Sequence, residues 1–298
     1  MSIRKLVAIT APILVVACAV VACACLLPLG HANSAPVAKY GSNVIIGAPK
    51  DTQPVVSDLT PVPLSDEQFR EIFTRLWGSE AAATVHRVTE PMSQSVVLQH
   101  VEYATLQTEL TGNWCGYRSE ASGLYGAQGT FNVRFNTTGH QATWVGLGNT
   151  GPLLQTGIDG GQGYHDAWIE QLPNDPVPYF AVQQNDIIDA SVGLDSGTGL
   201  WVASIYDATS SYSAMQAFSG SIDRKGAWIV EKMAGSQLGT FGNITFSNCQ
   251  WWNAGGTLSN INAGTGYYYE DYIQSGGGTQ VWPGSLYNGG NAFSVSRN

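Results

Sequence analysis

The stretch QATWVGLGNTGPLLQTGIDGGQGYHDAWIEQ, residues 141–171, alternates short apolar–polar segments with glycine-rich connections. Its three segments, Gln141–Leu147, Leu153–Asp159 and Tyr164–Gln171, have the length and alternation of β-strands. The Gly, Asn and Pro residues between them are typical of turns. This stretch therefore predicts three successive strands of a β-sheet.

Similar segments continue on both sides of this stretch. Further predicted strands are Gly129–Phe135, Ile187–Leu194, Gly199–Asp207, Ser213–Gly220, Ala227–Glu231 and Gly242–Ser247. From about Thr111 onward the sequence shows no long helical pattern and no internal repeat. Such a regular run of strands and turns predicts an all-β sandwich or barrel. After Gln250 the tail is rich in Gly, Asn, Tyr and Ser, and it either adds strands or forms an aromatic loop.

One helix, Ser65–Trp77, is predicted before the strands. Ser65 and Gln68 have the spacing of a capping box, and Gly78 is a stop signal. A helix of this length is marginal alone in water, so we expect it to pack on the domain that follows. Its apolar residues recur at helical spacing: Phe69, Ile72, Phe73 and Leu76.

The chain divides into three parts by composition. Arg4 and Lys5 precede an apolar run from Leu6 to about Leu29, so residues 1–35 are expected to be a signal peptide or membrane anchor. Val-Ala-Cys at residues 16–18 and 21–23 also resembles lipoprotein processing sites, so secretion, membrane anchoring and lipoprotein attachment remain open. Residues 36–110 are expected to be a linker and propeptide carrying the helix. Residues 111–298 form the predicted β-domain.

Composition excludes several functions. Hydrophobic residues make up 44% of the chain and charged residues only 12%, which suits a packed β-domain with a broad contact surface. The net charge is −9 and no basic patch occurs, so nucleic-acid binding is not expected. No metal-ligand spacing is present, and His140 and His165 have no nucleophile as a sequence partner. We expect a monomer without metal or other cofactor.

Only Cys115 and Cys249 lie outside the N-terminal segment. In an oxidising compartment they would form one disulfide, which would stabilise the fold by about 4 kcal/mol. Otherwise they are two buried free thiols. The sequence leaves both readings open because it does not give the separation of the two residues.

Several predicted strands carry acidic and aromatic groups on one face. Positions two apart share a face, so Gln155 lies with Asp159, Asp166 with Trp168, and Trp144 with two small residues. Such a face is too polar for a core and too aromatic for an ordinary solvated surface. It predicts the floor of a binding groove.

Six motifs in order resemble the glutamic peptidase (eqolisin) family between about Gly112 and Asn248. They are Asn113-Trp114, TWVG at 143–146, LQTGID at 154–159, YHDAW at 164–168, AWIVE at 227–231 and FGNITF at 241–246. The resemblance implies an antiparallel β-sandwich of the concanavalin A-like or jelly-roll type, with a substrate groove on one sheet and polypeptide substrates.

The resemblance also implies the site residues. Glu231 and Gln155 match the catalytic pair. Glu231 would activate a water molecule, and the Gln155 amide would stabilise the oxyanion. A glutamate pKa of about 4.3 would suit an acid endopeptidase. The positions that match groove or supporting residues are Trp114, Trp144, Asp159 and Asp166.

Two features depart from the family. Gly148 stands where an acid is usual, so a supporting partner is missing. Residues 36–110 carry five Lys/Arg and nine Asp/Glu, whereas the family's leader is basic. Inhibition by this leader would therefore have to rest on packing, with the helix Ser65–Trp77 as the candidate.

Two other functions fit part of the pattern. A carbohydrate-binding sandwich would use the same aromatic and acidic face without catalysis. A glycoside hydrolase would need a second carboxyl group opposite Glu231, for which Glu170 and Asp166 are candidates. The motif around Gln155 favours the peptidase, because neither alternative needs that amide.

Overall fold

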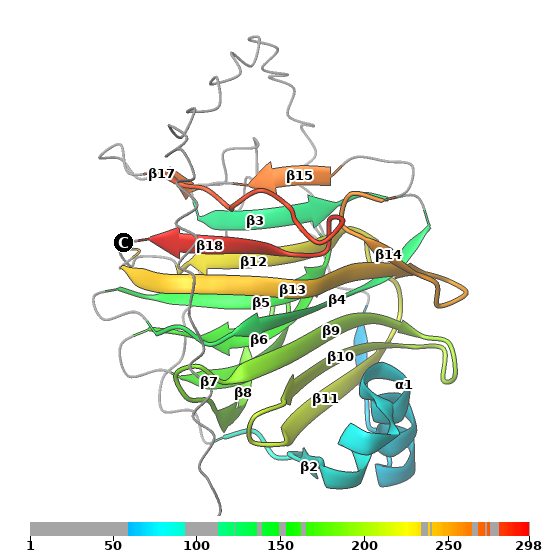
Figure 1. The fold of residues 1–298 in the computed structure, drawn as a ribbon. Helices are drawn as coiled ribbons and strands as arrows, with labels where there is room; N and C mark the ends of the chain where they lie inside the picture. Colours follow the sequence, from blue (N-terminus) through cyan, green and yellow to red (C-terminus); the bar gives the residue numbers. More distant parts are fainter. Residues whose placement is uncertain are drawn as a thin grey trace, which may run out of the picture. The chain divides into compact units, whose positions relative to one another are not determined.

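The computed structural model describes residues 59–92, 113–121, 123–135, 139–148, 153–161, 165–233, 238, 240–263, 268–271, 273–274 and 280–297. This part forms two large β-sheets and one helix (Figure 1). The expected signal or anchor segment 1–35 lies outside the described residues. Where the chain is described, no helix is long and apolar enough to cross a membrane.

The first sheet has nine strands. They are β1 (Thr60–Val62), β2 (His86–Arg87), β4 (Leu124–Asn132), β9 (Ile187–Asp195), β10 (Leu200–Asp207), β11 (Tyr212–Ser219), β13 (Phe241–Asn253), β14 (Leu258–Asn260) and β18 (Phe293–Arg297). Their order is β1-β11-β10-β9-β4-β13-β14, with β18 beside β13 and β2 beside β11. Among these strands β2 pairs with β11 in parallel, and the other pairings are antiparallel.

The second sheet has seven strands in the order β15-β3-β12-β5-β6-β7-β8, all antiparallel. Their bounds are β3 (Trp114–Ser119), β5 (Gln141–Leu147), β6 (Leu154–Asp159), β7 (Asp166–Gln171), β8 (Val177–Ala181), β12 (Gly226–Lys232) and β15 (Tyr268–Asp271). Two short strands, β16 (Ile273–Gln274) and β17 (Gln280–Val281), pair with each other.

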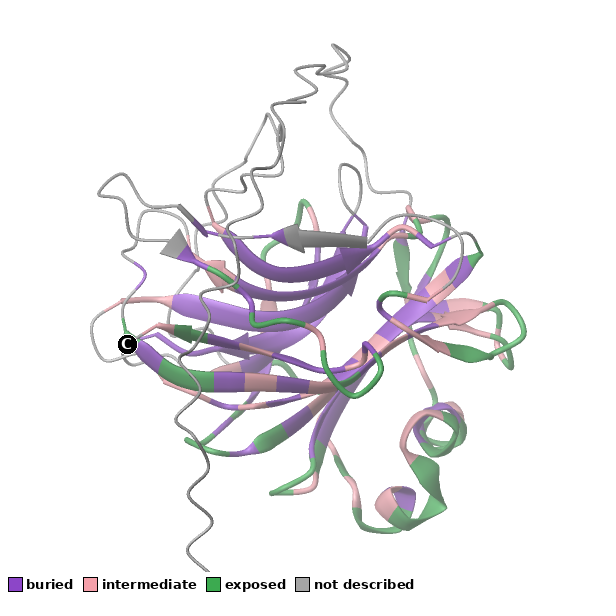
Figure 2. Ribbon diagram, turned by 45° about the horizontal axis from the view of Figure 1, so that its top comes forward, coloured by how far each residue is buried: buried purple, intermediate pink, exposed green. Residues whose placement is uncertain are grey.

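The two sheets pack face to face around the main hydrophobic core. Phe131, Ile205 and Phe246 of the first sheet and Val145 and Trp228 of the second are fully buried there. The Trp228 Nε1–H also donates to the Gln128 carbonyl of β4 at 2.7 Å, which joins the two layers. β3, β5 and β6 of the second sheet are buried along their whole length, whereas buried and more exposed residues alternate in β13 (Figure 2). The predicted all-β sandwich is therefore confirmed.

The helix α1 (Asp66–Thr84) begins as predicted. Ser65 caps it, and both hydrogen bonds of the capping box with Gln68 are present. At Gly78 the helical path breaks with φ of 89°, a conformation that glycine adopts without strain, and a second short helical run continues to Thr84. The predicted stop at Gly78 is thus a kink rather than the end.

The helix covers the outer face of the first sheet. Phe69, Ile72 and Phe73 pack against Tyr206 of β10 and Met215 of β11. Neighbouring positions on these strands, including Ile205 and Ala214, point to the main core instead. The helix therefore lies on the side of the sandwich away from the second sheet, and it cannot inhibit by filling a groove on that sheet.

Residues 59–92 pack on the sandwich. β1 extends the first sheet beside β11, and Leu59 enters the main core. Arg75 of α1 forms two hydrogen bonds of 2.9 Å with Asp195 at the end of β9. The domain boundary at residue 111 stays a prediction.

The predicted strands correspond closely to the observed ones, with two exceptions. β4 begins at Leu124, five residues before the prediction, and β13 continues to Asn253. The sequence pattern missed β1, β2, β3 and β8, where Pro61, Gly116 and Pro178 weaken the strand signal. The tail after Gln250 adds strands to both sheets, which resolves the choice left open above.

Candidate active site

Strand register brings the predicted site residues onto one face of the second sheet. Glu231 of β12 lies between Trp114 of β3 and Ala142 of β5, and Ala142 in turn lies beside Asp159 of β6. Paired residues in antiparallel strands point to the same side. These side chains therefore form one row across the outer face of the sheet.

Two further rows continue along the same face. Ile229, Trp144, Gly157 and Trp168 form the next one. The third consists of Arg118, Ala227, Gly146, Gln155 and Glu170. Glu231 and Gln155 thus share a face and stand two strands and two rows apart.

Glu231 is held by N–H donors. Asn113 Nδ2 donates to its Oε1 at 2.9 Å, Trp144 Nε1 donates to its Oε2 at 2.9 Å, and the side chain of Trp114 forms a third hydrogen bond. The Trp114 and Trp144 rings meet edge to face at 5.2 Å. Donors on both oxygens match a carboxylate better than a carboxylic acid.

Burial and hydrogen bonding shift the pKa of Glu231 in opposite directions. Burial raises its pKa from 4.5 to about 7, while the hydrogen bonds from Trp144, Trp114 and Asn113 oppose the rise. The side chain itself is only partly buried. Glu231 therefore titrates well above an ordinary glutamate and remains accessible to a water molecule.

Gln155 is paired with an acid that the sequence pattern does not link to it. Its Nε2 donates to Oε2 of Glu170, the residue directly opposite on β7. Its Oε1 is buried and has no hydrogen-bond partner among the described residues. The pKa of Glu170 is raised from 4.5 to about 8: burial is the largest cause, the bond with Gln155 opposes the rise, and the charges of Glu231 and Asp175 add to it. The charge of Glu231 therefore affects the pKa of Glu170.

Two glycines lie close against Trp144, where a side chain would clash. A Cβ at Gly157 would come within 2.6 Å of the Trp144 Cβ and 2.2 Å of the Thr143 carbonyl oxygen. A Cβ at Gly146 would lie 3.1 Å from Trp144 Cζ3 and 3.0 Å from Gln155 Cβ. The small residues of the motifs thus make room for the indole that donates to Glu231.

Asp159 and Asp166 lie at one end of the face. His140 Nε2 contacts Asp159 Oδ1 at 2.5 Å, and the Gly161 N–H donates to the same oxygen at 3.0 Å. Burial and the charge of Asp159 raise the pKa of Asp166, and His165 opposes the rise. Asp159 thus lies in the row of Glu231, with Asp166 close to it, and their supporting role stays a prediction.

Cys115 and Cys249 are buried thiols that are not joined by a disulfide in the structure. Cys115 lies on β3 and Cys249 on β13, in opposite sheets of the same core. Of the two readings, the structure therefore has the pair of thiols and not the disulfide.

Gly148 follows β5 with φ of 120°, a conformation that favours glycine. An acidic residue at this position would be strained in this backbone. The departure from the family pattern therefore has a local structural reason.

Sequence reasoning missed three partners of the site residues. Asn113 was quoted as part of a motif but not assigned a contact, although it immediately precedes Trp114. Glu170 was considered only as a second acid for sugar chemistry. His140 was given no partner, although it contacts Asp159. The signal for Glu170 was present, because it shares the alternation of Asp166 and Trp168.

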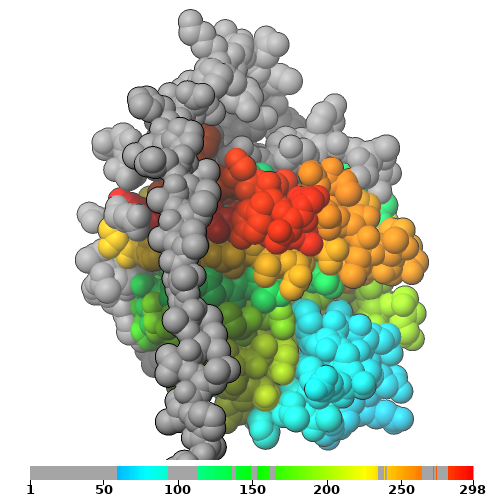
Figure 3. All heavy atoms as spheres, in the orientation of Figure 1, coloured from blue at the N-terminus to red at the C-terminus, as the bar shows by residue number. Residues whose placement is uncertain are grey.

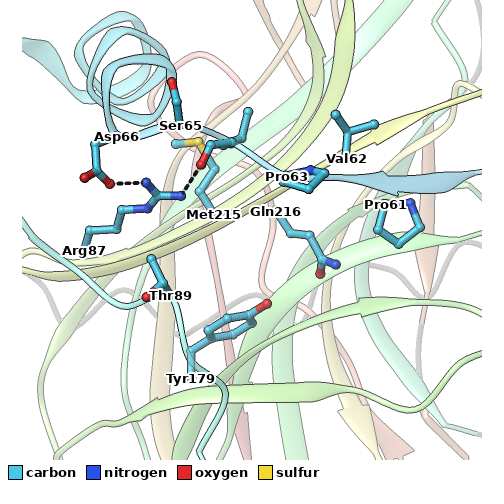
Figure 4. A pocket seen from close by; sticks show the side chains of 11 residues that line it. Pro61, Val62, Pro63, Ser65, Asp66, Arg87, Thr89, Tyr179, Met215 and Gln216 are labelled. Atoms are coloured by element: carbon cyan, nitrogen blue, oxygen red, sulfur yellow. Dashed lines mark hydrogen bonds and ion pairs between the residues drawn. The ribbon is translucent and has the colours of Figure 1, made fainter.

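A pocket of about 620 Å³ lies away from this face, between residues 61–89 and strands β8 and β11 (Figure 4). Pro61, Arg87, Tyr179 and Met215 are among its lining residues. Arg87 forms an ion pair with Asp66 beside it. None of the residues predicted for the site lines this pocket.

The model of the Peptidase A4 family matches residues 112–295. The chain belongs to this family. It is a glutamic peptidase, and its substrates are polypeptides. Among the described residues, no group of His, Cys, Asp and Glu could hold a metal ion. The carbohydrate-binding and glycosidase alternatives are set aside by the family assignment.

Solved structures agree on the fold. Scytalido-glutamic peptidase, crystallised with a peptide-based transition state analogue, is 21% identical with a TM-score of 0.53, and the match covers 63% of this chain and 100% of that one. SCP-B, a member of the eqolisin family solved with the tripeptide Ala-Ile-His, is 18% identical with a TM-score of 0.50 and the same coverage. A search of curated proteins gave no match.

Proposed function

We propose that this peptidase cleaves internal peptide bonds, with Glu231 as the base that activates water and Gln155 as the donor that stabilises the oxyanion. The hydrogen-bond arrangement of Glu231 carries the proposal. Burial disfavours the ionised form of Glu231. The hydrogen bonds donated by Asn113, Trp144 and Trp114 favour that form.

The chemistry balances with these two groups. Ionised Glu231 takes a proton from water while the water oxygen attacks the scissile carbonyl carbon. The carbonyl oxygen gains negative charge and accepts a hydrogen bond from the Gln155 amide, a contribution of about 3 kcal/mol at comparable sites. Glu231 then gives its proton to the leaving nitrogen as the C–N bond breaks. The amide donor is neutral and does not itself titrate.

The acid optimum expected from the sequence is untested, and the raised pKa of Glu231 predicts a different profile, with activity still rising toward neutral pH. With a Glu231 pKa of about 7, about one molecule in a thousand carries the ionised base at pH 4 in the free enzyme. The base role therefore predicts that kcat/KM rises about tenfold per pH unit between pH 4 and 6. A profile that is flat or falling over this range would instead mean that protonated Glu231 starts the reaction by donating to the carbonyl oxygen.

Digestion of a denatured protein such as casein tests the assignment. Glu231→Gln and Gln155→Ala should each lower kcat at least about 100-fold. Glu67→Gln, an exposed glutamate on α1, is the matched control and should keep full activity. Full activity in either site variant would remove that residue from the proposed pair. Product peptides with new internal termini would establish endopeptidase action.

We also infer export, from the charged start and apolar run of residues 1–35. The natural removal of 36–110 is a separate question, because residues 59–92 are packed on the sandwich. N-terminal sequencing of the secreted protein answers both points. A start near residue 36 supports export with the segment retained, whereas a start between about residues 100 and 113 supports removal of the propeptide.

A further inference from the structure

The two ends of the Gln155 carboxamide have different surroundings. One end meets Glu170, and the other is buried and has no hydrogen-bond partner in the part of the chain that the structure describes. Amide nitrogen and oxygen have nearly the same shape, so the environment decides which atom stands at which end. The assignment of Gln155 as oxyanion donor places a requirement on this choice.

An oxyanion needs an N–H at the end away from Glu170. Nitrogen must then stand there, and Oε1 must face Glu170. An amide oxygen only accepts hydrogen bonds, so Glu170 has to donate, which a carboxyl group does only when it holds its proton. We propose that Glu170 is a positioning residue that acts in its protonated form, donating its O–H to Gln155 Oε1 and turning the amide N–H groups toward the substrate. This inference rests on the proposed function of Gln155.

The surroundings of Glu170 favour the protonated form. The residue is 5% exposed and lies directly opposite Gln155 in the strand register. The charges of Glu231 and Asp175 both disfavour its ionisation. The one cation in its row of the described sheet, Arg118, is bound to Asp271 by two hydrogen bonds of 2.5 and 2.8 Å.

The arrangement also explains why the two glutamates on this face differ in their tendency to lose a proton. Glu231 accepts hydrogen bonds on both oxygens and is suited to lose its proton. Glu170 faces an amide and two negative charges and is suited to keep its proton. Burial raises the pKa of Glu170 to about 8 and that of Glu231 to about 7, which agrees with this order.

Two substitutions of Glu170 separate a proton donor from a structural contact. Glu170→Gln keeps an N–H that can donate to Gln155 Oε1, and it cannot ionise. Glu170→Leu keeps the volume and loses the donor. We expect Glu170→Gln to retain kcat within about threefold and Glu170→Leu to lose about 100-fold in kcat with little change in KM. Glu67→Gln, which removes an exposed carboxylate on α1 far from the pair, is the control.

The pH profile gives a readout that packing alone would not move. Wild-type kcat should fall above about pH 8, where Glu170 loses its proton. The Glu170→Gln enzyme should lack this alkaline fall and keep the acid-side rise that belongs to Glu231. Equal loss of activity in the folded Gln and Leu variants, or full activity in Glu170→Leu, would overturn the proposal.

Infrared spectroscopy tests the protonation without relying on activity. At pH 6 the wild type should show a carboxylic-acid C=O band that Glu170→Gln lacks. Absence of this band would overturn the proposal even in an active enzyme. If the wild type cleaves no peptide and Glu231→Gln changes nothing, the proposed function fails, while the band still decides whether Glu170 is the proton donor to Gln155.

Discussion

Replacing Glu170 by glutamine should change how the stability of the fold depends on pH. Burial raises the pKa of Glu170 from 4.5 to about 8. Because the folded pKa lies above the unfolded one, the folded state keeps a proton that the unfolded state releases. The resulting stabilisation is complete below about pH 4.5 and is lost as the pH rises through about 8.

The size of the effect follows from the shift. A rise from 4.5 to about 8 corresponds to about 5 kcal/mol, at ~1.36 kcal/mol per pKa unit. The side chain is 5% exposed, so solvent screens little of this difference. Glutamine has nearly the same shape and cannot ionise. Between pH 4.5 and 8.5 the free energy of unfolding of Glu170→Gln should therefore fall about 5 kcal/mol less than that of the wild type.

Urea unfolding followed by tryptophan fluorescence at pH 4.5, 6 and 8.5 measures this difference. In thermal unfolding it corresponds to a relative Tm change on the order of 10 °C for a domain of this size. Asp175→Asn serves as the control for loss of a carboxylate near the same group. Parallel pH curves for the wild type and Glu170→Gln would refute the reasoning, because they would show that Glu170 titrates alike in the folded and unfolded states.

Three other substitutions test separate parts of the structure. Trp144→Phe removes the N–H that donates to Glu231, so the pKa of that carboxyl should rise and kcat/KM at pH 5 should fall about tenfold; a pH–rate profile unchanged from the wild type would contradict this. Phe73→Ala should cost about 3–5 kcal/mol in urea unfolding and leave kcat unchanged, because α1 covers the opposite side of the sandwich. Gly157→Ala would place a Cβ 2.2 Å from the Thr143 carbonyl oxygen, so soluble yield should fall sharply, and a stable, soluble variant would count against the tight packing beneath the tryptophan.

Alternation and turn chemistry were sufficient to predict the long central strands. Gln141–Leu147 matches β5 in full, because it is rich in strand-forming residues and is flanked by Gly139 and Gly148. The edge strands escaped prediction, because their pairing depends on the neighbouring strand and not on their own side chains. β1 shows this clearly, since Pro61 sits in a strand whose position is fixed by β11.

The sequence predicts which faces of the strands carry the site residues, but it does not predict the contacts between those residues. Period-two spacing assigns Gln155 and Glu231 each to one face of its strand, but only the register of β12, β5 and β6 shows that these faces coincide. Contacts such as Asn113 with Glu231 join residues far apart in the chain. They depend on how the strands are ordered in the sheet, which periodicity does not encode.

The same burial acts on stability and on catalysis with opposite sign. Protons held by Glu170, Glu231 and Asp166 stabilise the folded state in acid, because burial raises the pKa of each. Asp195 on β9 of the first sheet stabilises the fold at higher pH instead, because the hydrogen bonds that it accepts from Arg75 and Thr198 lower its pKa despite partial burial. Yet a base must lose its proton, so what protects the groove in acid also reduces the ionised fraction of Glu231. The three N–H donors around the Glu231 carboxyl lower its pKa, whereas burial raises it. The activity at low pH measures the balance of these two effects.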